Sequence, residues 1–425
     1  MNAKVISNHL DIVIIWMLIL SVLIFRYLGL TSRVNILILV LIIVSIFLNI
    51  VSYLKDGSIV CLLAFSGYLV YNFHYLGGSL NLFLYNIFQI APSILSIIYI
   101  YHTLRERKDF TIRFLNERVL LFNIYLYICI PFILLQASGQ YWLAGATNGN
   151  SNSLGVDLIS GLFGFNGTPM LALFVAFIMI FNYDYYRYQC RKKQKSLFVA
   201  LSVPLFLFYN ILPLLNDNKA YYLVLLIFLF LYFIAVKFDV NKSRSHLEIN
   251  AKRIGILLTA TLLFSILFIV LLQIQPIRTI FEKIIKEVKQ GWEYGSKSHG
   301  SNERIGMIQF ALSDGNHSLR GYGIGRHSWT ERYLFGFWHY GQSDLGTFLC
   351  LGGILFSIFL FILIFILSKG IIESTFYRIL IVSTFFILAI YTQVFTVMSL
   401  TVSALLVIIL CVSGYSHSSE RELQI

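Results

Sequence analysis

The sequence predicts an all-α polytopic membrane protein with about twelve transmembrane helices. Of the 425 residues, 58% are hydrophobic. Only 12% are charged, whereas roughly a quarter of the residues of an average soluble domain are charged. Apolar runs of about 20 residues, the length that crosses a bilayer, recur along the chain between short polar breaks. These observations exclude a water-soluble globule.

The apolar runs give the order of the predicted spans. The first run is too long for the core of a signal peptide and lacks a small-residue cleavage site, so we interpret it as the first span. The predicted spans lie near residues 10–30, 34–53, 58–76, 82–101, 119–137, 168–186, 197–214, 220–237, 254–273, 346–368, 377–396 and 397–413.

The distribution of Lys and Arg predicts the orientation, because basic residues in short loops resist translocation. With the N-terminus inside, 20 of the 32 basic residues fall in inner segments and 12 in outer segments. Nine of those 12 lie in one long outer loop, residues 274–345. Both termini are therefore expected to be cytoplasmic. The net charge of +12 is then explained by the basic residues of the inner loops, and we expect no nucleic-acid partner.

Two outer segments are long enough to have a function of their own. Residues 138–167 are rich in Gly, Asn and Ser, and residues 274–345 are rich in aromatic residues. The chain thus divides into nine spans over 1–273, the long outer loop over 274–345, and three spans with a cytoplasmic tail over 346–425. The five cysteines show no CxxC spacing and no Asp-x-Asp or His cluster is present, so we expect neither a metal nor a cofactor.

The long outer loop contains two predicted helices. Residues 277–288 have an apolar face with a period of 3.6, which suits a helix lying on the outer membrane surface or packing on neighbouring spans. Ser301 and Asn302 can cap a second helix, with Glu303 near its positive end and Arg304 in its first turn.

A glycine-rich segment follows at 320–326, where three glycines stand between Arg320 and Arg326. Such a composition lets the backbone approach an anion while guanidinium groups bind its oxygens, although glycine-rich turns are also common. The aromatic residues around it can either stack on sugar rings or form an interfacial belt. They include Tyr322, Trp329, Trp338 and Tyr340.

Three titratable residues stand at predicted membrane boundaries. His339 and Asp344 close the long loop, where a base with a pKa near neutrality can act, or where a histidine faces headgroups and an aspartate caps a helix. Lys219 ends a short outer hairpin, where a lysine either extends to the interface or stands over a cavity.

Taken together, these features resemble the O-antigen polymerase and O-antigen ligase superfamily of membrane glycosyltransferases, with a GT-C-like arrangement. The resemblance covers the whole architecture and is most specific at the Lys219 hairpin, at Arg304 with residues 319–325, and over residues 339–353. Ligases typically carry His, then Asn, Ser or Gln, then nine residues and Gly-x-x-Gly.

Here Gln342 and Gly352 fit the ligase pattern, but Gly341 and Leu355 replace its His and its last Gly. His339 stands two residues early. This departure favours the polymerase branch of the superfamily.

The resemblance implies a metal-independent, inverting polymerase in the bacterial inner membrane, with its site facing the periplasm. It would transfer a growing glycan from undecaprenyl diphosphate to a carrier-linked repeat unit, with a chain-length regulator protein as a further partner. Implied diphosphate ligands are Lys219, Arg304, Arg320 and Arg326. Implied sugar contacts are Tyr322, Trp329, Trp338 and Tyr340. The implied base is His339, with Asp344 and Glu303 as alternatives.

Other classes stay open at this point. An O-antigen ligase differs only in its acceptor, and a lipid-linked oligosaccharide flippase or other transporter can also have twelve spans. Transporters usually carry repeated halves with paired broken spans, which the sequence does not show clearly. A polyprenyl-phosphate-sugar mannosyltransferase would need carboxylates in the first outer loop, and residues 31–35 have none.

Overall fold

The fold is helical throughout the part of the chain that can be described. The computed structural model describes residues 3–55, 57–144, 158–165, 167–191, 197–216, 220–237, 266, 269–270, 272–273, 275–328, 334–337, 342–369, 371–372, 374–406 and 409. Over these residues there is no β-strand, which confirms the predicted all-helical class.

The described helices include those predicted from the apolar runs, although the first begins and ends seven residues earlier than predicted. They are α1 (Ala3–Leu23), α2 (Thr31–Leu48), α3 (Ile50–Lys55), α4 (Ser58–Leu76), α5 (Leu80–Glu106), α6 (Lys108–Asn116), α7 (Val119–Ala137), α8 (Thr168–Arg191), α9 (Leu197–Leu215), α10 (Ala220–Lys237), α12 (Gln275–Tyr294), α13 (Glu303–Ser313), α14 (Asp344–Ser368) and α15 (Thr375–Tyr391). Residues 398–406 are also helical.

Among the described residues, six helices are long and apolar enough to cross a membrane, namely α2, α4, α5, α7, α8 and α14. Shorter apolar helices lie within α1, α9, α10 and α15. The chain is thus a helical membrane protein, while a total of twelve spans stays a prediction. Most of the predicted span at 254–273 lies outside the described residues.

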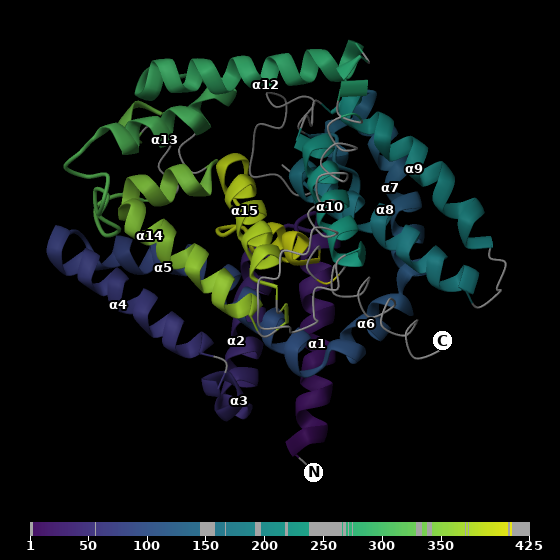
Figure 1. Cartoon of the computed structure of the whole chain (residues 1–425), viewed down its shortest axis with the longest axis horizontal. Coiled ribbons are helices and arrows are strands. Elements are labelled where there is room, and N and C mark those ends of the chain that lie inside the picture. Colours follow the sequence, from purple (N-terminus) through teal and green to yellow (C-terminus); the bar gives the residue numbers. More distant parts are fainter. Residues whose placement is uncertain are drawn as a thin grey trace, which may run out of the picture.

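The predicted amphipathic helix is confirmed as α12. Figure 1 shows α12 lying across one end of the bundle with α13 beneath it, and the N-terminus of α1 at the opposite end. Gly291 of α12 lets the two helices touch, because a Cβ there would lie 2.5 Å from the carbonyl oxygen of Asn302. Helix α12 therefore packs on a helix of the same predicted outer loop, while Ile285 and Trp292 of α12 remain exposed. Whether its other face meets the membrane surface or neighbouring spans stays a prediction. We call this end of the molecule the α12 end.

Helix α14 is interrupted at Gly353, whose backbone adopts φ 69° and ψ −171°. In an unbroken helix the amides of residues 354 and 355 would donate to the carbonyls of residues 350 and 351. The break leaves all four groups without helical partners. Irregular backbone of this kind is tolerated at membrane depth only where protein or water satisfies it.

Residues 318–325, which we call the junction loop, satisfy those four groups. Tyr322 and Gly323 donate their amides to Cys350 and Leu351 at 2.7 and 3.0 Å. The amide of Ile354 donates to Ser318 at 2.9 Å, and that of Leu355 donates to Leu319 at 3.3 Å. The loop therefore replaces the hydrogen bonds that the broken span loses.

Polar side chains of α4 and α5 fix the junction loop from its other side. The buried amide of Asn72 donates to the Arg320 carbonyl at 2.7 Å and accepts from the Ile324 amide at 3.1 Å. Asn86, also buried, donates to the Ile324 carbonyl at 2.6 Å. The hydroxyl of Tyr68 donates to the Gly352 carbonyl at 2.5 Å. These contacts explain why polar residues occur inside two apolar helices.

Candidate functional site

Arg304 stands where α13 meets the start of α14, at the α12 end of the bundle. Its side chain is half-buried, and its Nη2 donates to the Oε1 atom of Gln342 at 3.3 Å. The start of α13 at Glu303 confirms the predicted helix start. Asn302, however, makes no side-chain capping bond, and instead donates to the Oε1 atom of Gln290 of α12 at 3.2 Å. The predicted capping by Asn302 is therefore wrong.

Arg320, a second implied diphosphate ligand, contacts a different element of the fold. The Arg320 guanidinium lies 4.5 Å from the ring centre of Tyr75 and 5.8 Å from that of Tyr71, both on α4. Arg326 is exposed. Gln342 lies two residues before α14, whereas the backbone of Arg320 lies beside Gly353, about 13 Å from the start of that helix.

Arg304 and Arg320, two of the four residues of the implied diphosphate clamp, have separate protein neighbours in the described part of the chain. Their convergence on one diphosphate stays a prediction. Lys219 lies outside the described residues, so its place in the clamp stays a prediction. The amides of Tyr322, Gly323 and Ile324 donate to protein acceptors and cannot cradle an anion at the same time.

The glycines of the junction loop instead serve close packing. A Cβ on Gly321 would lie 2.5 Å from the carbonyl carbon of Leu351. A Cβ on Gly325 would lie 2.6 Å from the ring of Phe73 on α4. Glycine is needed at these positions because the backbone approaches its neighbours too closely for a side chain.

Tyr322, a predicted sugar contact, is engaged within the protein. Its hydroxyl donates to the Oδ2 atom of Asp314 at 2.5 Å. Its ring stacks on His317 with centres 4.3 Å apart and lies 4.4 Å from that of Phe335. These contacts do not favour a sugar-stacking role. The other predicted contacts, Trp329, Trp338 and Tyr340, and the predicted base His339 lie outside the described residues.

Asp344 is fully buried, with 0% of its surface exposed. Its carboxylate accepts hydrogen bonds from the amide of Phe395 at 2.5 Å, and from the amide and hydroxyl of Thr396 at 3.2 and 2.7 Å. Ser343, and not Asp344, caps α14 by accepting from the Gly346 amide at 3.1 Å. The contacts favour a structural role that joins the start of α14 to the turn after α15. Glu303, the other alternative base, is also buried.

Replacing Asp344 with alanine is expected to lower the free energy of unfolding by about 3 kcal/mol or more, because it leaves several buried donors without their acceptor. Thr396→Val removes only the hydroxyl donor and is expected to cost about 1 kcal/mol. Thermal unfolding of the detergent-solubilised variants measures the difference. Equal midpoints for the two variants would argue against the anchoring role of Asp344.

Sequence reasoning missed the pair formed by Asp314 and His317. The Nδ1 atom of His317 lies 3.0 Å from the Oδ2 atom of Asp314, just after the end of α13. Both side chains remain partly exposed, His317 at 41% and Asp314 at 31%. The signal was present in the sequence, because an aspartate and a histidine three residues apart beyond a helix end can meet within one turn.

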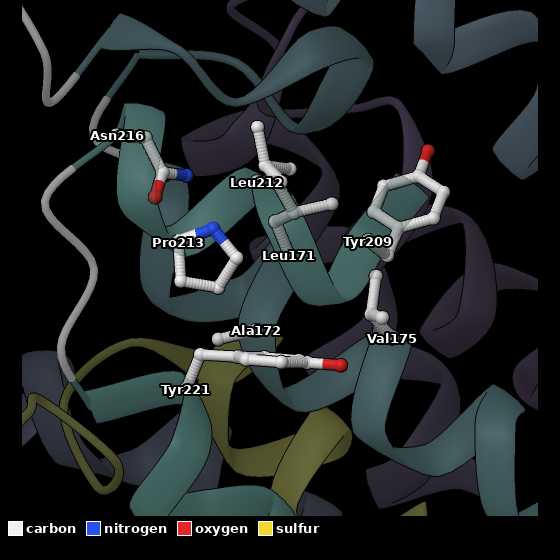
Figure 2. Close-up of a pocket in the computed structure, with 8 residues that line it drawn as sticks. All are labelled: Leu171, Ala172, Val175, Tyr209, Leu212, Pro213, Asn216 and Tyr221. Atoms are coloured by element: carbon white, nitrogen blue, oxygen red, sulfur yellow. The ribbon is translucent and has the colours of Figure 1, made fainter. Parts of the chain in front are cut away.

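A small cavity lies between α8, α9 and α10 (Figure 2). Its lining has no charged side chain and consists of Leu171, Ala172, Val175, Tyr209, Leu212, Pro213, Asn216 and Tyr221. This apolar surface does not suit a diphosphate. Within the described ranges, no group of three His, Cys, Asp or Glu side chains is placed to hold a metal ion.

Comparison with known proteins gave no match to a protein-family model, to a curated protein sequence or to a solved structure.

Proposed function

We propose that this protein is an O-antigen-type surface polysaccharide polymerase in the inner membrane of a bacterium. It would transfer a growing glycan from undecaprenyl diphosphate to the sugar of a second carrier-linked repeat unit. The observation that carries this proposal is Arg304, a half-buried guanidinium held against Gln342 at the α12 end. The predicted topology puts that end in the periplasm, where both substrates would be presented.

A cation at this position suits the chemistry. An enzyme outside the cytoplasm has no nucleotide sugar at hand, so its donor must arrive already activated and attached to lipid. The diphosphate is that activation, and its departure is favoured by a fixed positive charge in a partly water-excluded site. Arginine is well suited because its planar fork binds phosphate oxygens bidentately.

The reaction would be a single displacement. The acceptor hydroxyl attacks the anomeric carbon opposite the diphosphate, which predicts inversion of configuration. A retaining route would need a carboxylate nucleophile at the site. Asp344 and Glu303 are both buried, so neither is favourably placed for that role. The reaction would need no metal, and a chain-length regulator protein would be a further partner.

A transporter is the second candidate, and the break in α14 is the observation that favours it. Discontinuous spans often form the substrate sites of transporters, where their free backbone groups bind ions or substrate. Here the amides of Ile354 and Leu355 donate to the junction loop, and the Cys350 and Leu351 carbonyls accept from it. The break is thus filled by the protein itself, which favours the polymerase.

Lipid analysis of a deletion strain tests the proposal. Loss of a polymerase is expected to leave surface glycan limited to single repeat units and to accumulate lipid-linked single units on the periplasmic face. Accumulation on the cytoplasmic face would instead indicate a flippase, and accumulation of lipid-linked polymer would indicate a ligase. Restoring the intact chain must restore the wild-type pattern.

Arg320→Ala is expected to reduce polymer length and amount by about tenfold, less than Arg304→Ala. Arg320 packs on Tyr75 apart from Arg304, so it would add to the positive potential at the leaving diphosphate without contacting it. Tyr75→Leu is the matched control, since it removes the ring under the guanidinium and keeps the charge. Gel analysis of surface glycan at equal protein levels measures both. If Tyr75→Leu lowers polymer as much as Arg320→Ala, the arginine acts by holding the junction loop on α4.

A further inference from the structure

Asp314 holds three hydrogen-bond donors around one carboxylate. Its Oδ2 atom accepts from the Tyr322 hydroxyl at 2.5 Å and lies 3.0 Å from Nδ1 of His317. Its Oδ1 atom accepts from the amide of Asn316 at 3.2 Å. The aspartate is therefore fixed in orientation by its own loop, and it fixes the histidine in turn.

The pair with Asp314 selects one tautomer of His317. A carboxylate at Nδ1 keeps the proton on that nitrogen and leaves Nε2 as the proton acceptor. The imidazole ring is also held in plane, because it stacks on Tyr322 at an interplanar angle of 8°. Yet the side chain is 41% exposed, so the ring is oriented without being enclosed. An imidazole that is fixed in orientation and partly open to solvent suits general-base catalysis.

The protonation states support the same arrangement. Burial, followed by the hydrogen bond to Asp314, raises the pKa of Tyr322, so its hydroxyl stays protonated and donates. That hydrogen bond is the main cause that lowers the pKa of Asp314 below its ordinary value of 3.8. A lowered pKa keeps the carboxylate ionised through neutral pH, and its support for His317 is lost only when the pH falls through the lowered value.

The position of the pair agrees with a role in the proposed reaction. His317 directly precedes the junction loop, whose backbone is fixed to α14, α4 and α5. Arg320 stands three residues further along, with its guanidinium beside Tyr75. His317 and Arg320 thus come from one fixed segment, while Arg304 lies in the first turn of α13, at the other end of the helix that His317 follows.

We infer that His317 is the general base of the proposed glycosyl transfer, with Asp314 and Tyr322 as its positioning residues. This inference rests on the proposed function and assigns to a described residue the role that the family resemblance implies for His339. The ligand at this position is the free hydroxyl of a carrier-linked sugar acceptor.

The acceptor oxygen forms a bond to the anomeric carbon of the donor sugar, and the bond between that carbon and the diphosphate oxygen breaks. The electron pair of the broken bond leaves with the lipid diphosphate. The hydroxyl proton passes to Nε2 of His317, and the resulting imidazolium is stabilised by the Asp314 carboxylate until it releases the proton to water.

Steady-state kinetics of the full-length protein in lipid vesicles tests the inference, with a lipid-diphosphate-linked repeat unit as substrate. His317→Ala is expected to lower kcat by about a hundredfold to ten-thousandfold with little change in KM, the range typical of a lost general base. Added imidazole is expected to restore part of that kcat. Asp314→Asn and Tyr322→Phe are expected to lower kcat by smaller factors without imidazole rescue.

His299→Ala is the matched control, because His299 is an exposed histidine of the same predicted outer loop. It is expected to keep the wild-type kcat. If the wild-type protein forms polymer and His317→Ala is fully active, the inference is overturned and the proposed function stays intact. Absence of any new glycosidic bond with the wild-type protein would overturn the proposed function itself.

A second measurement does not depend on the folding of variants. Carbethoxylation of the wild-type protein, mapped by mass spectrometry, is expected to modify His317 and to inactivate the protein in parallel. The lipid-linked repeat unit is expected to prevent both the modification of His317 and the loss of activity. Full activity of protein that is modified at His317 would overturn the inference.

Discussion

Arg304→Ala is expected to abolish polymer formation while the amount of protein in the membrane and the single-unit surface glycan stay unchanged. The physical reason is the loss of a half-buried charge that would face the leaving diphosphate. Fixed charges in such sites typically contribute about a hundredfold to a thousandfold to the rate. The glycan ladder on a gel, read at matched protein level, measures the effect.

Three variants serve as controls for Arg304. Arg278→Ala removes an exposed arginine of α12 that pairs with Glu282 at 2.8 Å, and it is expected to leave polymer unchanged. Arg304→Lys keeps the charge without the planar fork and is expected to retain partial activity. Gln342→Ala removes the partner of the guanidinium and is expected to have a smaller effect. Normal long-chain glycan in Arg304→Ala would remove the central cation of the proposal.

Gly353→Ala is expected to destabilise the fold strongly. A Cβ at this position would lie 2.4 Å from the carbonyl carbon and oxygen of Leu319 and 2.5 Å from the amide nitrogen of Arg320. Both neighbours are backbone atoms of the junction loop, which cannot move without breaking its hydrogen bonds to α14. We expect a loss of about 4 kcal/mol or more, which is in the range that marks a specific structural failure.

Gly77 provides a closely matched control for Gly353. Its φ and ψ of 72° and −167° almost equal those of Gly353, but a Cβ on Gly77 meets no atom within 4 Å. Gly77→Ala therefore carries the same backbone strain, about 1–3 kcal/mol, without the clash. The thermal unfolding midpoints of the two variants separate these causes. Equal midpoints would contradict the close insertion of the junction loop into α14.

The sequence was sufficient for features that depend on local patterns. The apolar runs of α4, α7 and α10 predicted helices whose bounds match the structure closely. The apolar periodicity of α12 likewise predicted its helix, because a period of 3.6 is visible within one segment. The helix start at Glu303 followed from polar residues directly before an apolar stripe.

The features that the sequence did not reveal depend on contacts between distant segments. No local pattern indicates that residues 318–323 form hydrogen bonds with residues 350–355. The glycines of the loop therefore suggested an anion site, whereas in the structure they allow close backbone packing. The role of Asp344 depends on Thr396, which lies beyond another helix. The Asp314 and His317 pair was local, but its spacing is also common at ordinary helix ends.

The most direct test of the account is reconstitution of the purified full-length protein in vesicles with an undecaprenyl-diphosphate-linked repeat unit. The account predicts that free undecaprenyl diphosphate is released in step with glycan that grows by whole repeat units. It further predicts that Arg304→Ala stops both together. Movement of the lipid-linked unit across the bilayer without a new glycosidic bond would contradict the account.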